Sequence, residues 1–167
     1  MPKRSDDAKG GRRRTPADHL VVKHDAIRSE AVQSLVRNIL IVGASEADVR
    51  LVVSLLRASL GRHVEARMAI GAVAAGRALG TERPNLVILR HTESYGAEAV
   101  DVVRDWRHAG IETRVVVILE HLTPRDAIAM RRADSVDVIE ADDLNSVTLF
   151  EALLKAVPGA FEPDEGD

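Results

Sequence analysis

The chain has 167 residues, the length of one ordinary domain whose core needs no disulfide or metal to hold it together. Aromatic residues are only 2% of the composition, which excludes a platform of aromatic rings for stacking nucleic-acid bases. The sequence has no Cys, and this excludes disulfides, thiol nucleophiles and thiolate metal sites. Because there is no signal-peptide pattern and no long apolar run, we expect a cytoplasmic protein without a membrane span.

Charge is distributed unevenly along the chain. Residues 1–16 hold six basic and two acidic side chains, a local charge of +4, while the whole chain carries −3. With few apolar residues, residues 1–17 are predicted to form a disordered basic tail, and residues 158–167 an acidic one. The basic tail is either a nucleic-acid-binding or membrane-binding patch, since Arg12, Arg13 and Arg14 can contact phosphates, or simply a solvated terminus.

Residues 18–37 have a weak helical pattern. Leu20, Ile27, Ala31 and Leu35 fall on one side at helical spacing. We therefore expect a linker or extension helix between the basic tail and the main domain.

From residue 38 onward, short apolar runs alternate with amphipathic helical patterns. The apolar runs predict strands at 39–42, 64–68, 86–89, 115–119 and 136–139. Helices are predicted at 46–60, 71–79, 97–109, 123–133 and 144–157. This alternation indicates an α/β fold with a doubly wound, five-stranded parallel sheet and helices on both faces. In such sheets, binding sites lie beyond the carboxyl ends of the strands.

Residues 38–157 resemble a receiver domain of the response-regulator (CheY-like) family. The resemblance is carried by Asn-Ile-Leu-Ile-Val at 38–42 with Ala47 and Asp48 after it, by the segment 84–89, by 109–111 and by 115–119. It implies a flavodoxin-like sheet of order 2-1-3-4-5. It also implies partners in two-component signalling and phosphorelay: a histidine kinase, a phosphotransfer protein or another receiver.

The activity of receivers depends on five positions, and all five differ here. The family has two acids after strand one that bind Mg²⁺, a phosphoryl-accepting Asp at the end of strand three, a Ser or Thr after strand four and a Lys after strand five. The corresponding residues in this chain are Gly43, Ala44, Arg90, Leu119 and Ala141. Magnesium requires oxygen ligands, and a guanidinium is neither a nucleophile nor a metal ligand. We therefore expect a degenerate pocket with no catalytic residue, no metal and no cofactor.

Arg90 has two interpretations. It is either a fixed cation that pairs with Glu120, Glu140 or Asp142 and locks one conformation, or a partly exposed side chain in a pocket without a role.

Two surfaces are candidate partner sites. The helix at 46–60 has a broad apolar face, which either binds a kinase-side partner or packs against the helix at 18–37; it contains Val49, Leu51, Val52, Leu55 and Leu56. The surface formed by 123–133, 136–139 and 144–157 carries opposite charges that suit a homodimer, including Arg131, Arg132 and Asp137.

The functional hypothesis is a non-enzymatic, phosphorylation-independent pseudo-receiver that acts as an adaptor or regulator in two-component signalling. The alternative is a nucleic-acid-associated transcriptional regulator that uses the basic tail, against which the acidic remainder of the chain argues.

Overall fold

The structure is a computed structural model that describes residue 30 and residues 34–61, 64–135 and 137–157. The expectations for the basic tail, for most of the helix at 18–37 and for the acidic tail lie outside the described residues. In the described part of the chain, no helix is long and apolar enough to cross a membrane.

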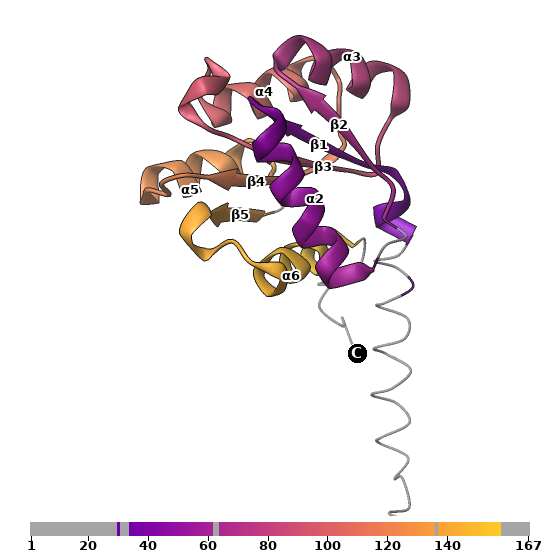
Figure 1. The fold of residues 1–167 in the computed structure, drawn as a ribbon. Coiled ribbons are helices and arrows are strands. Elements are labelled where there is room, and N and C mark those ends of the chain that lie inside the picture. The colour runs from indigo at the N-terminus through magenta and orange to yellow at the C-terminus, as the bar shows by residue number, and fades with distance from the viewer. Residues whose placement is uncertain (1–29, 31–33, 62–63, 136, 158–167) are drawn as a thin grey trace, which may run out of the picture.

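Five parallel strands form one sheet of order β2-β1-β3-β4-β5, which confirms the expected topology (Figure 1). The strands are β1 (Ile39–Gly43), β2 (Ala66–Ile70), β3 (Leu86–Arg90), β4 (Arg114–Leu119) and β5 (Asp137–Glu140). The central strands β1, β3 and β4 are almost wholly buried. Their continuous apolar sequences follow from this position, because a strand covered on both faces has no solvent side that favours polar residues.

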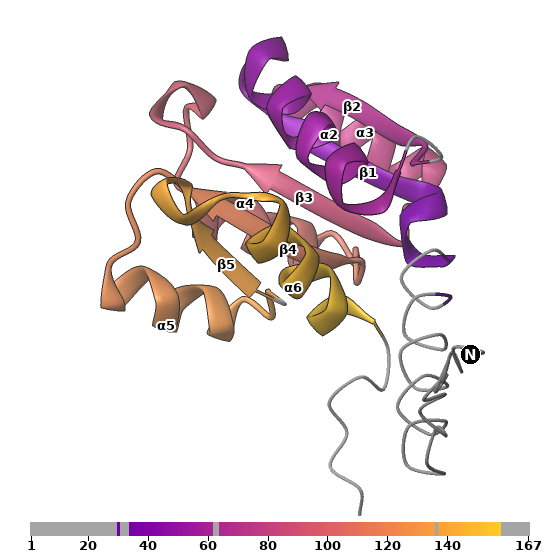
Figure 2. The ribbon, with the colours of Figure 1, turned by 60° about the horizontal axis from the view of Figure 1, so that its bottom comes forward.

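Helices cover both faces of the sheet. They are α2 (Glu46–Leu60), α3 (Ala72–Glu82), α4 (Ala99–His108), α5 (Pro124–Arg132) and α6 (Ser146–Ala156). Short 3-10 helices occupy Val36–Asn38, Glu93–Tyr95 and Ala141–Asp143. Figure 2 shows α2 and α6 in front of the sheet, and α3, α4 and α5 pack on the opposite face. The fold is therefore a three-layer α/β/α sandwich.

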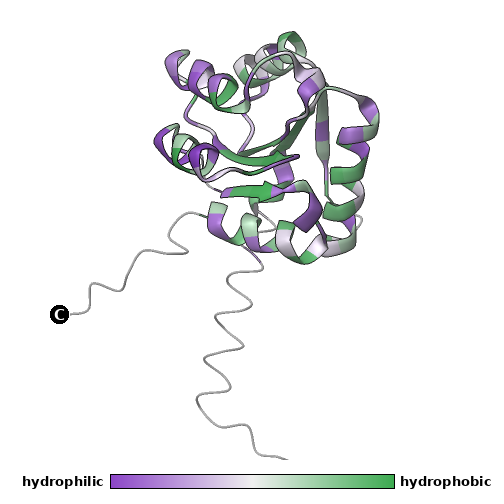
Figure 3. Cartoon of the chain, turned by 90° about the vertical axis from the view of Figure 1, so that its left-hand side faces the viewer, coloured by the Kyte–Doolittle hydropathy of each residue, from purple (hydrophilic) through white to green (hydrophobic). Residues whose placement is uncertain are grey.

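The pleat of each strand divides the core into two apolar layers. In β1, Ile39 and Ile41 pack with α2 and α6, whereas Leu40 and Val42 pack with α3 and α4. Successive side chains of a strand point to opposite faces, so the face that each terminal strand residue occupies is fixed by the same alternation. Apolar residues concentrate on the strands and on the inner faces of the helices (Figure 3).

Side-chain caps begin three of the helices at the carboxyl edge of the sheet. Ser45 accepts a hydrogen bond from the Asp48 amide, and Thr123 and Asn145 each form a capping box at the start of α5 and α6. These caps satisfy free amides and fix where each loop leaves the sheet. The first residues of α4 differ, because Glu98 provides no side-chain cap.

The sequence placed the β2 strand two residues too early. Val64 is buried but precedes the strand, while Met68 and Ile70 lie in it and are 51% and 46% exposed. β2 lies at the edge of the sheet, so some of its apolar side chains are exposed. An apolar residue therefore indicates a buried position in β1 but not in β2. The neighbouring helix α3 correspondingly starts at Ala72 and runs to Glu82 instead of ending at residue 79.

The core extends upstream of residue 38. Leu35 and Val36 are buried in the same layer as α2 and α6. The carboxyl end of the expected 18–37 helix thus contributes to the core of the domain.

Candidate functional site

The sheet register places the receiver-like positions side by side at the carboxyl edge. Gly43 pairs with Arg90, and Arg90 pairs with Ile118 on the other side. Leu119 ends β4 and pairs with Glu140, the last residue of β5. Ala44 follows β1 directly, and Ala141 begins the 3-10 helix after β5. The structure therefore brings the five expected pocket positions to one edge of the sheet.

Arg90 and Glu140 project from opposite faces of this edge. Arg90 shares a pleat with Leu86 and Ile88, which pack in the α2/α6 layer. Leu119, the strand partner of Glu140, packs in the α3/α4 layer. Because alternate residues face opposite sides, the sheet itself separates the guanidinium of Arg90 from the carboxylate of Glu140.

Of the two interpretations of Arg90, the ion pair with a neighbouring acid is not formed. Among the described residues, the ion pairs join Arg50 with Glu46, Arg67 with Glu82, Arg104 with Asp101 and Lys155 with Asp137. Thus Glu120, Glu140 and Asp142 are not ion-pair partners of Arg90.

Each side of the expected pair has its own alternative partner. Glu140 Oε1 accepts a hydrogen bond from the Leu122 amide at 3.2 Å. Arg90 Nη1 donates to the backbone oxygen of His91 at 3.4 Å, and its buried Nε has no partner among the described residues. Arg90 is therefore a half-buried cation with incomplete hydrogen bonding rather than half of a charge pair.

The residues at this edge do not fit the magnesium site that the receiver resemblance implies. Gly43 and Ala44 carry no side-chain oxygen, and a Cβ at residue 43 would lie 2.9 Å from Val49 Cγ2. The nearby Asp48 carboxylate accepts a hydrogen bond from Ser45 Oγ at 2.7 Å as part of the α2 cap. In the described ranges, no group of three or more His, Asp or Glu side chains could hold a metal ion.

The apolar face of α2 was one candidate partner surface. Most of this face belongs to the hydrophobic core of the domain. Val49, Val52 and Leu56 are fully buried between α2, the sheet and α6. Only Leu51, at 50% exposure, is clearly open to a partner, and Leu55 is partly buried against the core. The arc is broad because α2 packs against α6 as well as against β1.

The surface formed by α5, β5 and α6 retains its candidate basic residues. Arg131 and Arg132 are exposed in the last turn of α5. Asp137, on the other hand, is paired within the chain, since Lys155 Nζ lies 3.1 Å from its carboxylate. Sequence reasoning missed Ile128 on α5, which is 54% exposed. The signal was its spacing of two residues from the buried Met130, because residues two apart in a helix lie on different faces.

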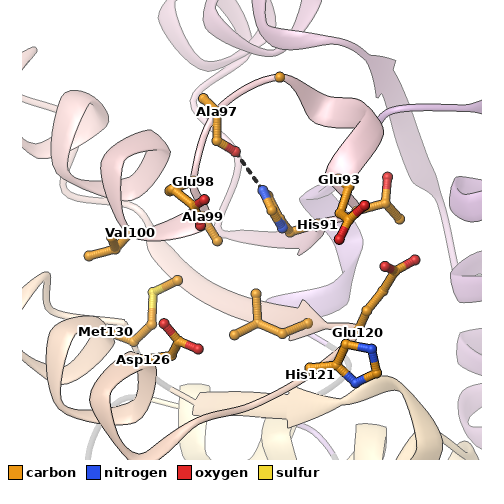
Figure 4. A pocket seen from close by; sticks show the side chains of 13 residues that line it. His91, Glu93, Ala97, Glu98, Ala99, Val100, Glu120, His121, Asp126 and Met130 are labelled. Atoms are coloured by element: carbon orange, nitrogen blue, oxygen red, sulfur yellow. Dashed lines mark hydrogen bonds between the residues drawn. The ribbon is translucent and has the colours of Figure 1, made fainter.

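A cavity of about 670 Å³ opens beside the receiver-like edge, between the loops that follow β3 and β4. Figure 4 shows His91 pointing to the backbone of Ala97, and its Nε2 lies 2.6 Å from that carbonyl oxygen. The His91 ring is 6.0 Å from that of Tyr95. Burial raises the pKa of Tyr95 above its ordinary value, and its hydroxyl has no partner among the described residues. The sequence carries no signal for this cavity, because loops enclose it.

Solved structures identify the architecture, although the sequence matches no protein-family model and no curated protein. The receiver domain of the putative response regulator NarL from Mycobacterium tuberculosis superposes with a TM-score of 0.60, at 19% identity over 74% of this chain and 98% of that one. The chain has the receiver fold. A CheY-like receiver domain protein from Methanospirillum hungatei JF-1 gives a TM-score of 0.62 at 14% identity, over 75% of this chain and 96% of that one.

A receiver fold from another protein context is equally similar. The receiver domain of a signal transduction histidine kinase from Syntrophus aciditrophicus has a TM-score of 0.59 and 18% identity, covering 77% of this chain and 96% of that one. At these identities the likeness establishes the fold, and function must be argued from the residues of this chain.

Proposed function

We propose that this protein is a pseudo-receiver: a non-enzymatic, phosphorylation-independent module that binds proteins of two-component signalling in the cytoplasm. The observation that carries the proposal is the pairing of Gly43 with Arg90 at the carboxyl edge of the receiver fold. Gly43 has no side chain at a position where a receiver needs a metal-binding acid. Arg90 has a guanidinium at the position where a receiver needs its phosphoryl acceptor.

At the five receiver positions, the chain lacks the side chains that aspartyl phosphorylation requires. Arg90 has no oxygen nucleophile, so it cannot accept a phosphoryl group as an aspartate does. Leu119 offers no hydroxyl to the phosphoryl group, and Glu140 and Ala141 offer no ammonium to neutralise it.

The outer surface of α5 supports the interaction part of the proposal. Arg125, Ile128 and Arg132 follow one another at spacings of three and four residues, which places them on one face of the helix. All three are exposed, and Ile128 is an apolar side chain between two guanidinium groups. We call these three residues the α5 surface. An apolar anchor flanked by Arg is typical of interface hot spots, and the two cations favour an acidic partner.

The partner on the α5 surface is a histidine kinase, a phosphotransfer protein, another receiver or a second copy of this chain. A second copy would bring the acidic side chains beyond α5, which include Asp134, Asp142 and Asp143, to the α5 surface of its neighbour. Such an arrangement is self-complementary under two-fold symmetry.

The experiment is a capture of partners from nuclease-treated native lysate, with the full chain and its Ile128→Asp variant side by side. The matched control is Val73→Asp, because Val73 on α3 is also an exposed apolar residue, at 78% exposure. We expect two-component proteins to be recovered with the full chain and with Val73→Asp, and to be lost with Ile128→Asp. Recovery of no such protein, or equal recovery with Ile128→Asp, would overturn the proposal.

The charge of +4 on residues 1–16 supports a second candidate, a regulator associated with nucleic acid. Deletion of these residues separates the two. Loss of the captured proteins on this deletion or on nuclease treatment would favour nucleic-acid binding, whereas their retention favours the adaptor.

A further inference from the structure

The α5 surface carries positive charge that the described part of the chain does not neutralise. Arg125 and Arg132 are exposed, and neither takes part in the ion pairs of the described residues. Arg131, in the last turn of α5, is likewise exposed and outside these pairs. Asp126, the acid of α5, is engaged in the capping box at the start of the helix. The helix therefore presents three guanidinium groups around the exposed apolar side chain of Ile128.

Helices α5 and α6 end at the same edge of the sheet, the amino edge where the strands begin. Arg114, the first residue of β4, donates from Nη1 to the Ala156 carbonyl at the end of α6, at 3.0 Å. Lys155 Nζ lies 3.1 Å from the carboxylate of Asp137, the first residue of β5. The last residue of α5, Arg132, precedes Asp137 by only a short loop, and α5 and α6 flank β5 (Figure 2). The chain beyond α6 therefore leaves the domain near the last turn of α5.

The sequence continues beyond α6 with residues 158–167, whose charge is opposite to that of α5. This acidic tail contains no Lys or Arg, and its acids are Glu162, Asp164, Glu165 and Asp167. It also contains one aromatic residue, Phe161, directly before the first acid. Carboxylates form charge-assisted hydrogen bonds with guanidinium groups, and an aromatic ring can cover an exposed aliphatic side chain such as Ile128. The composition of the tail thus matches the α5 surface in both charge and apolar character.

The acidic tail is long enough to follow α5 over its whole length. Ten extended residues span about 33 Å, whereas a nine-residue helix such as α5 is only about 14 Å long. A short tether also keeps the tail near α5 at an effective concentration on the order of millimolar. Charge pairs that are weak between separate molecules can therefore hold the tail in place.

We propose that residues 158–167 bind the α5 surface of the same chain, with their acids on Arg125 and Arg132 and Phe161 over Ile128, and that they compete with partners for this surface. The competition rests on the proposed function, because it requires partners to use the α5 surface, whereas the contact itself does not. The basic residues 1–16 are the other possible site for an acidic tail. The α5 surface is favoured over them because it adds an apolar contact close to the point where the tail begins.

The contact is tested by paramagnetic broadening of amide resonances in the full chain. The sequence has no Cys, so Gly166→Cys provides a single site for a nitroxide label among the acids of the tail. We expect broadening along α5 at low salt. The broadening at Ile128 should fall at least about threefold in 1 M NaCl, where the screening length is about 3 Å.

Substitutions on α5 show whether this broadening depends on the α5 surface. The double variant Arg125→Gln/Arg132→Gln should reduce the broadening at Ile128 at least about threefold. The matched control Arg77→Gln, which removes an exposed Arg from α3, should leave it unchanged. Unfolding curves show that each variant remains folded.

Three results of the broadening experiment would overturn the proposal. The first is broadening at residues 1–16 in place of α5. The second is broadening at α5 that Arg125→Gln/Arg132→Gln leaves unchanged. The third is equal broadening in a mixture of spin-labelled chain and isotope-labelled, unmodified chain, because the contact would then join two molecules.

The competition is tested by partner capture with a neutralised tail, in which all four acids are replaced: Glu162→Gln, Asp164→Asn, Glu165→Gln and Asp167→Asn. This variant should recover at least about threefold more two-component protein from nuclease-treated lysate than the wild-type chain, because an occupied surface lowers the apparent affinity. Equal recovery by both chains would refute the competition and leave the adaptor function in place. Recovery of no two-component protein by either chain would refute the adaptor function and the competition, but not the contact seen by NMR.

Discussion

Gly43 has no room for a side chain, because Val49 Cγ2 lies 2.9 Å from the position that a Cβ at residue 43 would occupy. Val49 is fully buried and β-branched, so rotating its side chain away disturbs the α2/α6 layer. The packing of Val49 in the core therefore leaves no space for an acidic side chain at position 43. A metal-binding carboxylate could be restored here only by repacking α2 against β1.

Replacing Gly43 with Asp should lower the free energy of unfolding by about 2 kcal/mol or more, through overpacking and burial of a carboxylate. Urea denaturation measures the change. Gly76→Ala is the matched control, because Gly76 lies inside α3 with no atom within 4 Å of an added Cβ. That control should raise stability by up to about 1 kcal/mol from helix propensity. An unchanged free energy for Gly43→Asp would contradict the packing described here.

Arg90 contributes little to stability if it is an unpaired cation. Its Nε is buried without a partner among the described residues, and its Nη1 makes one long hydrogen bond. We expect Arg90→Met, which retains the aliphatic stem, to leave the free energy of unfolding within about 1 kcal/mol of the wild-type value or to raise it. Arg114→Met is the comparison, because Arg114 Nη1 donates to the Ala156 carbonyl at 3.0 Å. Loss of this hydrogen bond should lower the free energy of unfolding more than Arg90→Met does. A larger loss for Arg90→Met than for Arg114→Met would reinstate a locking role.

Tyr95 makes stability depend on pH in the alkaline range. Burial disfavours its charged form and raises its pKa in the folded chain above the unfolded value of about 10. The folded state therefore holds this proton more tightly, so the contribution is fully present below the unfolded pKa. It is lost as the pH rises through the folded pKa.

The measurement for Tyr95 is the difference in unfolding free energy between wild type and Tyr95→Phe from neutral to alkaline pH. We expect Phe to be tolerated at neutral pH, since the hydroxyl has no partner among the described residues, and to be the more stable of the two above about pH 10. Tyr95 is the only tyrosine in the sequence, so tyrosinate absorbance reports its titration directly. A midpoint at or below the ordinary value would contradict the burial.

Arg107 joins three separate backbone carbonyls. Its Nη1 donates to Ile111 O at 2.7 Å and Thr113 O at 2.8 Å, and its Nη2 donates to Asp134 O at 3.1 Å. Lysine lacks the planar fork that spans these acceptors, so Arg107→Lys should cost about 1 to 3 kcal/mol in thermal or urea unfolding. Arg104→Lys on the same helix, where Arg104 is exposed and pairs with Asp101, should cost less than about 0.5 kcal/mol. Similar costs for the two variants would show that the Arg107 contacts are not stabilising.

Much of the fold could be predicted because its central strands have continuous apolar sequences. β1, β3 and β4 were located to within one residue, since a strand buried on both faces leaves a run such as that at 115–119. The edge strand β2 was misplaced because Met68 and Ile70 are apolar yet exposed. An apolar run therefore indicates buried residues in a central strand, but not in an edge strand such as β2.

The candidate site could be predicted in its positions but not in its contacts. The strand ends are visible in the sequence, so Gly43, Arg90 and Leu119 could all be placed at the carboxyl edge, where the register pairs Gly43 with Arg90 and Arg90 with Ile118. Of the two interpretations of Arg90, the ion pair with Glu120, Glu140 or Asp142 was wrong, because proximity along the edge does not say which face of the pleat each side chain occupies. The cavity beside this edge depends on the paths of two loops, for which one sequence carries no periodic signal.

Phosphorylation independence is tested most directly by NMR spectra of the full chain with and without magnesium and beryllofluoride, a mimic of an aspartyl phosphate. We expect no change at the amides of Gly43, Arg90 and Leu119, because none of these positions carries a carboxylate that could bind the mimic. Saturable shifts at these amides that require both magnesium and beryllofluoride would contradict the account and show a working phosphorylation site.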